Sequence, residues 1–336
     1  MNSLERIAAA VDFQKADRVP VVAQVFGHAG TLAGVPLDDY VRDGEKLARC
    51  QIEALARYGY DAVFSVMDVS VETEAAGSTL NYRRNQYPVV DRHALQDDSD
   101  PEALPVPDPE HAGRMPEMLK ALRFLRSELG DEVLVLGCVV GPFTLTAQLL
   151  GIEKALFTAV DDFPRLERVM DYATEVAIRF GEAQLRAGAH LPMVFDPAAS
   201  PAVIPPRLFR EFELPRLRRL FEALGAAGAT SNWLHIAGPV KPILPFYPQA
   251  GIAIANFDYC VDPSEARSQL PATCLDGNIK SLAFVDSTPA AIGASAAGLL
   301  EAFGDSGGFI LSSGCEIPPE SRPENVAALV QAVGGA

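Results

Sequence analysis

The amino-acid sequence predicts an α/β protein made of a single (β/α)8 TIM barrel over residues 1–336. Eight apolar, β-rich runs alternate with segments of helical periodicity, and a parallel sheet built in this way needs right-handed helical crossovers. No Gly/Ser-rich linker, low-complexity run or repeat divides the chain. From length alone one large barrel fits as well as two domains. Closing eight strands into a barrel removes both sheet edges, which favours the barrel.

A doubly wound sheet is the alternative architecture. Its first strand is ordinarily followed by a Gly-rich nucleotide-binding turn with the spacing G-x-G-x-x-G. In this sequence the corresponding glycines are Gly27, Gly30 and Gly34, which do not have that spacing. The barrel therefore remains the prediction.

The first third of the chain supplies the start of the barrel and an insertion. Its expected elements are an amphipathic N-terminal helix at residues 3–13, a buried strand at 19–27 with a loop at 27–30, a helix at 44–58, and a second strand at 62–67 that ends at Asp68. Polar residues 71–110 interrupt this order, and we expect them to form a hairpin-like insertion over one rim of the barrel. A helix at 115–129 follows.

The alternation then becomes regular. We expect strands at residues 133–140, 191–195, 231–236, 252–257, 273–278 and 308–313. Helices are expected at 144–188 with breaks near Gly151 and Pro164, and at 205–224, 241–246, 263–270, 289–303 and 323–333. A barrel core takes about 250 residues, so the N-terminal helix and the insertion after strand two account for the excess length.

Composition excludes several classes of function. The net charge of −16 argues against nucleic acid and anionic membranes as partners, because phosphate binding needs clustered Lys and Arg. No apolar run is long enough to span a bilayer and the first residues lack a signal-peptide core, so we expect a cytoplasmic protein. The 5 cysteines are odd in number and widely spaced, which indicates thiols or metal ligands instead of a disulfide framework.

Polar residues follow the expected strands where each one ends. The carboxyl ends of all strands of a closed barrel face one mouth. Each residue alone could be a loop cap, His235 a core histidine, and Cys315 a small buried hydrophobe. Together, acids, amides, one imidazole and one thiol predict a site. The residues are Gln24, His28, Asp68, Asp196, His235, Asp258, Asn278, Cys315 and Glu316.

Short motifs that lie in order along nearly the whole chain resemble a known family. They include Arg18-Val19-Pro20, Gly141-Pro142-Phe143-Thr144, Leu234-His235-Ile236, Gly277-Asn278 and Ser313-Gly314-Cys315-Glu316-Ile317-Pro318. This pattern is similar to the uroporphyrinogen decarboxylase superfamily, and most similar to its corrinoid-dependent methyltransferase branch. The resemblance implies an enzyme that takes a methyl group from a methylcobamide, carried by a partner corrinoid protein, and gives it to a small acceptor.

Two departures place porphyrinogen decarboxylation second. The decarboxylases grip the carboxylates of their substrate with an Arg-rich first loop, whereas residues 19–41 contain no Lys or Arg. An acidic mouth without cations should repel a polycarboxylate. The decarboxylases also carry a histidine after the last strand, where this chain has Cys315.

A third departure concerns zinc. The branch that methylates coenzyme M holds zinc with a His-x-Cys pair and a later Cys, and here His235 and Cys315 match but the middle position is Ala237. A methyl side chain cannot bind a metal, so His235 and Cys315 form an incomplete zinc site. Replacement ligands are open among Asp196, Asp258, Cys260 and Glu316. The alternative is that zinc is absent and the acceptor is not a thiol.

The sequence therefore predicts a methyltransferase with tetrahydrofolate as the preferred acceptor. Catalytic roles are expected for Asp68, Asp196 and His235, and substrate binding for Gln24, His28, Asp258, Asn278 and Glu316. A pterin amine needs hydrogen-bonding carboxylates and amides more than it needs a Lewis acid. The alternatives are zinc-dependent methylation of a thiol such as coenzyme M, uroporphyrinogen decarboxylation, and a non-catalytic barrel that binds a corrinoid or pterin.

Overall fold

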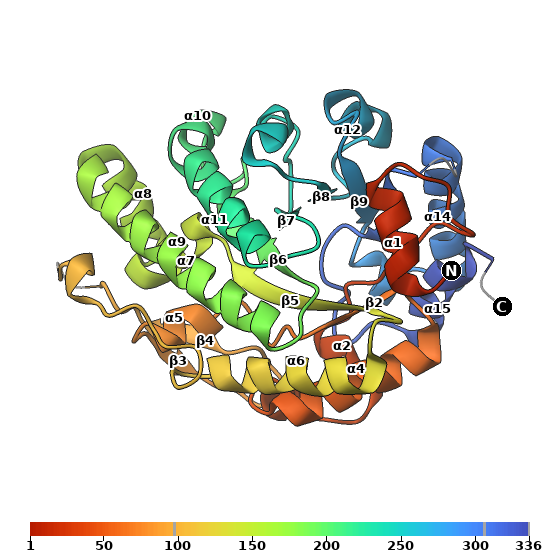
Figure 1. The fold of residues 1–336 in the computed structure, drawn as a ribbon, viewed down its shortest axis with the longest axis horizontal. Coiled ribbons are helices and arrows are strands. Elements are labelled where there is room, and N and C mark those ends of the chain that lie inside the picture. Colours follow the sequence, from red (N-terminus) through yellow and green to blue (C-terminus); the bar gives the residue numbers. More distant parts are fainter. Residues whose placement is uncertain (97–98, 305–306, 335–336) are drawn as a thin grey trace.

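Eight parallel strands form a nearly closed barrel in a computed structural model that describes residues 1–96, 99–304 and 307–334 (Figure 1). Around the barrel they follow the order β1-β10-β9-β8-β7-β6-β5-β2. The strands are β1 Val21–Val22, β2 Ala62–Phe64, β5 Leu134–Val140, β6 Leu191–Phe195, β7 Trp233–His235, β8 Ile254–Asn256, β9 Cys274–Ile279 and β10 Phe309–Ser313. The predicted (β/α)8 barrel is confirmed.

Helices surround the strands, and α1 with both chain ends lies on the side opposite the β3–β4 hairpin (Figure 1). The larger helices are α1 Ser3–Val11, α2 Gly27–Leu32, α4 Gly44–Tyr58, α5 Val71–Ala75, α6 Met115–Leu129, α7 Pro142–Leu150, α8 Ile152–Asp161, α9 Phe163–Arg186, α11 Leu214–Ala226, α12 Pro263–Gln269, α14 Pro289–Phe303 and α15 Pro323–Gln331. Shorter turns of helix are α3 Leu37–Tyr40, α10 Pro206–Leu208, α13 Ala283–Asp286, η1 Pro101–Ala103, η2 Pro197–Ala199, η4 Leu244–Ala250 and the π-helix η3 Phe209–Glu213.

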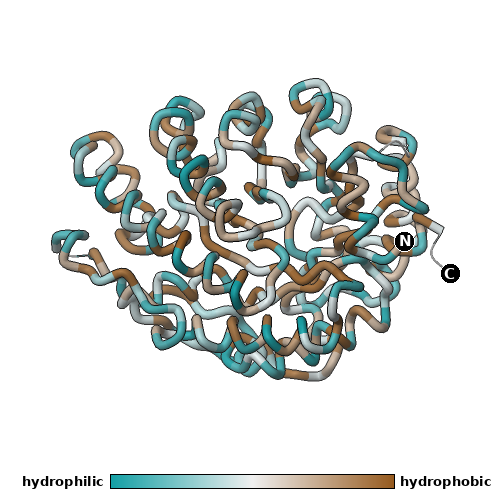
Figure 2. Tube along the Cα trace, viewed as in Figure 1, coloured by the Kyte–Doolittle hydropathy of each residue, from teal (hydrophilic) through white to brown (hydrophobic). Residues whose placement is uncertain are grey.

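Local sequence explains where several helices begin and end. Asn2 and Glu5 form a reciprocal capping box at the start of α1. The Asp43 side chain accepts from two backbone N–H groups at the start of α4, and Gly59 ends that helix in the left-handed conformation at φ 74°. Along α8 and α12 the trace alternates between hydrophobic and hydrophilic residues, as expected for helices that bury one face (Figure 2).

Four predicted elements were wrong in their boundaries or type. The strand expected at 19–27 pairs only at Val21–Val22, with an isolated bridge from Val25 to Ile317, because its apolar residues are buried without staying extended. The loop expected at 27–30 is instead the start of α2. The helix expected at 205–224 is divided by the π-helix η3, and the one expected at 241–246 begins at Leu244.

The seam between β1 and β2 is closed through a buried carboxylate, Asp61. Its backbone N–H donates to the Val21 carbonyl at 2.7 Å, and its side chain accepts from the Val21 N–H at 2.8 Å. Arg6 and Arg18 each bind the same carboxylate at 2.7 Å. A fully buried charge is tolerated when it is paired in this way, so these contacts hold the ends of the sheet together.

The predicted insertion contains an antiparallel hairpin, β3 Thr79–Asn81 and β4 Val89–Arg92. Tyr82 follows β3 and donates to Glu74 at 2.9 Å, while the Arg42 guanidinium lies 3.8 Å from its ring centroid. Tyr87, which precedes β4, contacts the rim through Glu316 and the backbone of Gly27. These contacts hold the hairpin over the carboxyl ends of the strands.

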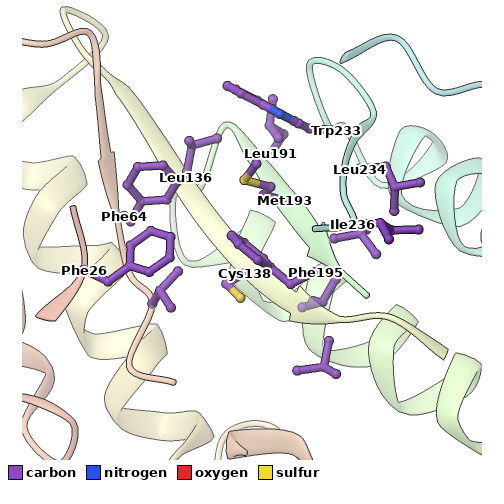
Figure 3. Close-up of a cluster of buried hydrophobic side chains, with 14 of the residues drawn as sticks. Phe26, Phe64, Leu136, Cys138, Leu191, Met193, Phe195, Trp233, Leu234 and Ile236 are labelled. Atoms are coloured by element: carbon purple, nitrogen blue, oxygen red, sulfur yellow. The ribbon is translucent and has the colours of Figure 1, made fainter. Parts of the chain in front are cut away.

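Aromatic and aliphatic side chains fill the barrel interior (Figure 3). Phe26 packs edge-on against Phe64 with ring centroids 4.9 Å apart, and against Phe195 at 5.8 Å. Trp233, from β7, is fully buried. Because the interior is packed with side chains, space for a ligand is expected at the mouth. No helix within the described residues is long and apolar enough to cross a membrane.

Candidate active site

A cavity of about 190 Å³ lies at the carboxyl ends of the strands. It brings together four of the predicted site residues, Asp68, His235, Cys315 and Glu316. Its remaining lining is mostly apolar and comes from the loops after β1, β2 and β6 and from the hairpin: Phe26, Val66, Val69, Tyr87, Pro88, Phe195 and Pro197. A small apolar cavity with a few convergent polar groups is typical of a small-molecule site.

His235 is the last residue of β7 and is 2% exposed. Its ring packs beside Phe195 with centroids 4.8 Å apart, and its Nδ1 has no hydrogen-bond partner among the described residues. Burial in these surroundings lowers the pKa of the imidazole to about 3. The ring is therefore neutral at physiological pH, which leaves a nitrogen lone pair able to accept a hydrogen bond.

Cys315 and Glu316 follow β10 and line the same cavity as His235. Burial raises the pKa of the Cys315 thiol to about 11, so it is protonated at neutral pH. The Glu316 carboxylate accepts from the Tyr87 hydroxyl and, at 3.3 Å, from the Gly27 N–H. Although Glu316 is partly exposed as a residue, burial of its carboxyl raises the pKa to about 7. The hairpin thus contributes Tyr87 to the site.

Asp68 lines the cavity but is held by Arg114. The guanidinium Nη1 lies 2.5 Å from Asp68 Oδ2, and Nη2 lies 3.2 Å from Oδ1. The Ser70 N–H also donates to Oδ1 at 2.8 Å. Arg114 is 7% exposed and its pKa is raised, because the attraction of Asp68 and Glu74 outweighs the cost of burial. Asp68 is therefore one half of a buried ion pair.

Asp196 does not line the cavity; its carboxylate caps the start of α7. It accepts from the Thr144 N–H at 2.8 Å and the Thr144 hydroxyl at 2.6 Å. A Cβ at Gly141 would collide with this carboxyl, which explains the glycine of the Gly-Pro-Phe-Thr motif. Glu213, from η3, is fully buried and faces Asp196. Burial raises the pKa of both carboxyls, so the pair is stable when it shares a proton.

The other predicted residues also lie outside the cavity lining and stabilise the rim. Asp258 accepts from the Gly238 N–H at 2.8 Å and the Tyr259 N–H at 2.7 Å. Asn278 Nδ2 donates to the carbonyls of Asp258 and Val261. The two ring nitrogens of His28 contact the Pro319 carbonyl and the Tyr58 hydroxyl. Gln24 Nε2 donates to the Ser313 carbonyl. Loop capping accounts for these contacts.

The side chains present do not fit a three-ligand zinc site. In residues 1–96, 99–304 and 307–334, no group of three or more His, Cys, Asp or Glu side chains is placed to hold a metal. His235 and Cys315 line one cavity, while the position two after His235 is Ala237. Of the possible replacements, Asp196, Asp258 and Glu316 already accept hydrogen bonds, and Cys260 is exposed. We therefore derive no chemical step through a metal.

Sequence reasoning missed Arg114 and Glu213, and it assigned Tyr87 only to the hairpin. Arg114 follows the insertion and Glu213 lies inside an amphipathic helix, so neither stands at the end of a strand. Site residues were predicted where a hydrophobic run ends at a polar residue, and this pattern identifies only residues at the ends of strands. These three residues reach the rim through tertiary packing.

The sequence is similar to known proteins along nearly its whole length. The family model described as "Uroporphyrinogen decarboxylase (URO-D)" matches residues 2–335. The chain is 28% identical over 335 residues to the methylcobamide:CoM methyltransferase MtaA of Methanosarcina barkeri, which covers 97% of this chain and 96% of the relative. It is 29% identical to the uroporphyrinogen decarboxylase of Syntrophotalea carbinolica, over 86% of this chain and 83% of that one.

A solved structure gives the same comparison in three dimensions. A methyltransferase from Methanosarcina mazei superposes with a TM-score of 0.91 at 27% sequence identity, covering 99% of this chain and 98% of that chain. The two structures share the fold along nearly their whole length.

Proposed function

The chain belongs to the uroporphyrinogen decarboxylase (URO-D) family, and from this premise we propose that it transfers a methyl group from a methyl-corrinoid protein to a small thiol. The observation that carries the proposal is the cavity that contains both His235 and Cys315 at the mouth of the barrel. A relative named as a methylcobamide:CoM methyltransferase aligns with 97% of the chain, which supports the same reaction class.

A thiol replaces tetrahydrofolate, the acceptor expected from the sequence. The corrinoid-dependent relatives are named for coenzyme M, and this favours the alternative over the preferred acceptor. The cavity, at about 190 Å³, is also smaller than the roughly 300–1,000 Å³ of sites for drug-sized ligands, a class to which a pterin with its tail belongs. Of the four residues expected to hold the pterin, Asp68 lines the cavity, whereas Asp196, Asp258 and Asn278 lie outside the lining.

The reaction moves a methyl group together with its positive charge. The acceptor sulfur forms the new C–S bond, the electron pair of the broken Co–C bond stays on cobalt, and the thiol proton passes to solvent. The corrinoid is a substrate brought by its partner protein. In this proposal, the neutral imidazole of His235 accepts a hydrogen bond from the thiol S–H, and the rings of Phe26 and Phe195 form an apolar wall beside the sulfur.

Decarboxylation of uroporphyrinogen is the second candidate, favoured by the relative from Syntrophotalea carbinolica. Against it stands the absence of Lys and Arg from residues 19–41 and from the described lining of the cavity. A substrate with many carboxylates needs bidentate cationic partners. The volume of about 190 Å³ also suits a far smaller molecule than a tetrapyrrole.

The test is demethylation of methylcobalamin, followed at visible wavelengths, with coenzyme M, homocysteine and tetrahydrofolate supplied separately. 2-Mercaptoethanol is supplied as a fourth acceptor, so that one thiol carries no anionic group. We expect a thiol to support turnover and His235→Ala to slow it by at least about tenfold, which corresponds to the loss of one hydrogen bond of about 1.4 kcal/mol. His111→Ala is the matched control, because the His111 side chain is 81% exposed. Turnover with tetrahydrofolate alone would refute the thiol acceptor, and any turnover excludes a non-catalytic barrel.

A further inference from the structure

The cavity offers no positive charge to a ligand. Its described lining contains two carboxyl groups, on Asp68 and Glu316, with the imidazole of His235 and the thiol of Cys315. No Lys or Arg is among these lining residues. An anionic group that entered this space would lose its hydration without gaining a counter-charge.

The cation behind the cavity wall is fully engaged. Arg114 contacts Asp68 from behind, and a guanidinium has five N–H donors. Nε donates to Glu74 at 2.6 Å, Nη1 to Asp68 and to the Val41 carbonyl, and Nη2 to Asp68 and to the Ser70 hydroxyl. All five donors are therefore used, and Arg114 has none left for the head group of a ligand.

Backbone N–H groups at the mouth already donate hydrogen bonds to carboxylates of the chain itself. Such groups at helix starts commonly bind anions. Here the chain supplies its own carboxylates: Glu316 at Gly27, Asp68 at Ser70, Asp196 at Thr144, and Asp258 at Gly238 and Tyr259. An external sulfonate or carboxylate would have to displace one of these internal partners. The acids predicted from the sequence thus occupy the natural anion positions of the rim.

We propose that the acceptor selected by this cavity is a small thiol whose far end carries no negative charge, and that anionic thiols such as coenzyme M, a sulfonate, are poor substrates. This inference rests on the proposed methyl transfer and narrows its substrate class. It also separates the chain from relatives that are named for coenzyme M.

The experiment compares three thiols that share the frame HS–CH2–CH2–X and differ only in the far end. They are 2-mercaptoethanol with a hydroxyl, cysteamine with an ammonium, and coenzyme M with a sulfonate. Demethylation of methylcobalamin by the full chain is measured with each, and rates are corrected for the uncatalysed reaction and for the fraction of thiolate. We expect kcat/KM for 2-mercaptoethanol and for cysteamine each to exceed that for coenzyme M by at least about tenfold, because neither carries a negative charge into the cavity. A higher kcat/KM with coenzyme M overturns the inference and leaves the proposed function intact.

A pair of variants tests the cause. Val69 lines the cavity and Val203 does not, yet both are 37% exposed valines in loops of the rim. Val69→Arg adds a cation to the cavity and should raise kcat/KM for coenzyme M relative to 2-mercaptoethanol by about tenfold, whereas Val203→Arg should leave the ratio unchanged. Equal ratios in the two variants contradict the inference.

Binding provides a readout that does not need turnover. If none of the three thiols supports demethylation, the proposed function fails. Calorimetric titration of the unaltered protein with 2-mercaptoethanol and with coenzyme M then tests the inference alone. Tighter binding of 2-mercaptoethanol supports an uncharged ligand, and tighter binding of coenzyme M refutes it.

Discussion

Replacing Arg114 by methionine should destabilise the protein severely, because the buried carboxylate of Asp68 and the half-buried carboxylate of Glu74 both depend on this side chain. Arg114 is 7% exposed and Asp68 is 8% exposed, so little water can replace the lost contacts. Removing one partner of a buried ion pair typically costs about 3–5 kcal/mol, since it leaves an uncompensated buried charge. We expect Arg114→Met to lower the free energy of unfolding by about that amount.

Arg123→Met is the matched control. Arg123 also donates to a carboxylate, Glu110, at 2.7 Å and 3.0 Å, but its side chain is 53% exposed and that of Glu110 is 50% exposed. An exposed pair of this kind contributes about 0.2–1 kcal/mol. Arg114→Lys should fall between the two, because an ammonium has three donors and cannot serve every acceptor that Arg114 contacts.

Urea unfolding followed by far-UV circular dichroism at pH 7 gives the free energies, provided that the slope with urea is the same for all variants. The expected order of loss is Arg114→Met, then Arg114→Lys, then Arg123→Met. If Arg114→Met and Arg123→Met lie within about 1 kcal/mol of each other, the buried network is not what holds Asp68 in place, and the account of the rim is wrong.

Three further changes probe the interior, the hairpin and the metal position. Burial raises the pKa of Asp276 to about 7, so ionisation of this carboxyl destabilises the folded state, and the free energy of unfolding should fall as pH rises from about 4 to about 7. Asp276→Asn should remove up to about 4 kcal/mol of this pH dependence, measured by urea unfolding at several pH values. Tyr87→Phe takes a hydroxyl donor from the Glu316 carboxylate and should cost about 1–3 kcal/mol by the same measurement, with an unchanged midpoint arguing against the contact. Ala237→Cys supplies the missing third zinc ligand beside His235, and competition with a chromophoric chelator should show higher zinc affinity than in the unaltered chain.

Hydrophobic pattern was sufficient to predict the barrel, because each strand is a short apolar run and each crossover helix is amphipathic. It failed where burial and strand pairing diverge. Residues 23–26 are buried but unpaired, apart from the bridge at Val25, so an apolar run there was mistaken for a longer strand. The π-helix at Phe209–Glu213 leaves no comparable signal, since its residues keep a helical periodicity.

The position of the site was predictable and the direction of its side chains was not. Strand ends gave Asp68, His235, Cys315 and Glu316, all of which line the cavity. Asp196 also follows a strand, but its carboxylate turns to the N–H groups of α7, a contact 52 residues away in sequence. No local pattern encodes such a contact, because it depends on how closely two elements pack.

The ion pair between Arg114 and Asp68 could not be predicted from the sequence either. It lies 46 residues from Asp68 and begins a helix beyond the insertion, so its sequence neighbours give no sign of the mouth. An arginine in such a position is ordinarily a solvent-exposed residue. Only the packed structure shows that it neutralises the carboxylate at the cavity wall, which in turn shows that Asp68 is not a free acid.

The central claim, methyl transfer from a corrinoid to a small thiol, is tested most directly by measuring substrate and product together. The unaltered protein is incubated with methylcobalamin and 2-mercaptoethanol, loss of the cobalt-bound methyl is followed at visible wavelengths, and the S-methyl product is quantified by mass spectrometry. The account predicts one S-methylated thiol for each methylcobalamin consumed, at a rate that falls at least about tenfold in His235→Ala. Consumption of methylcobalamin without S-methylated product, or an equal rate in His235→Ala, would contradict it.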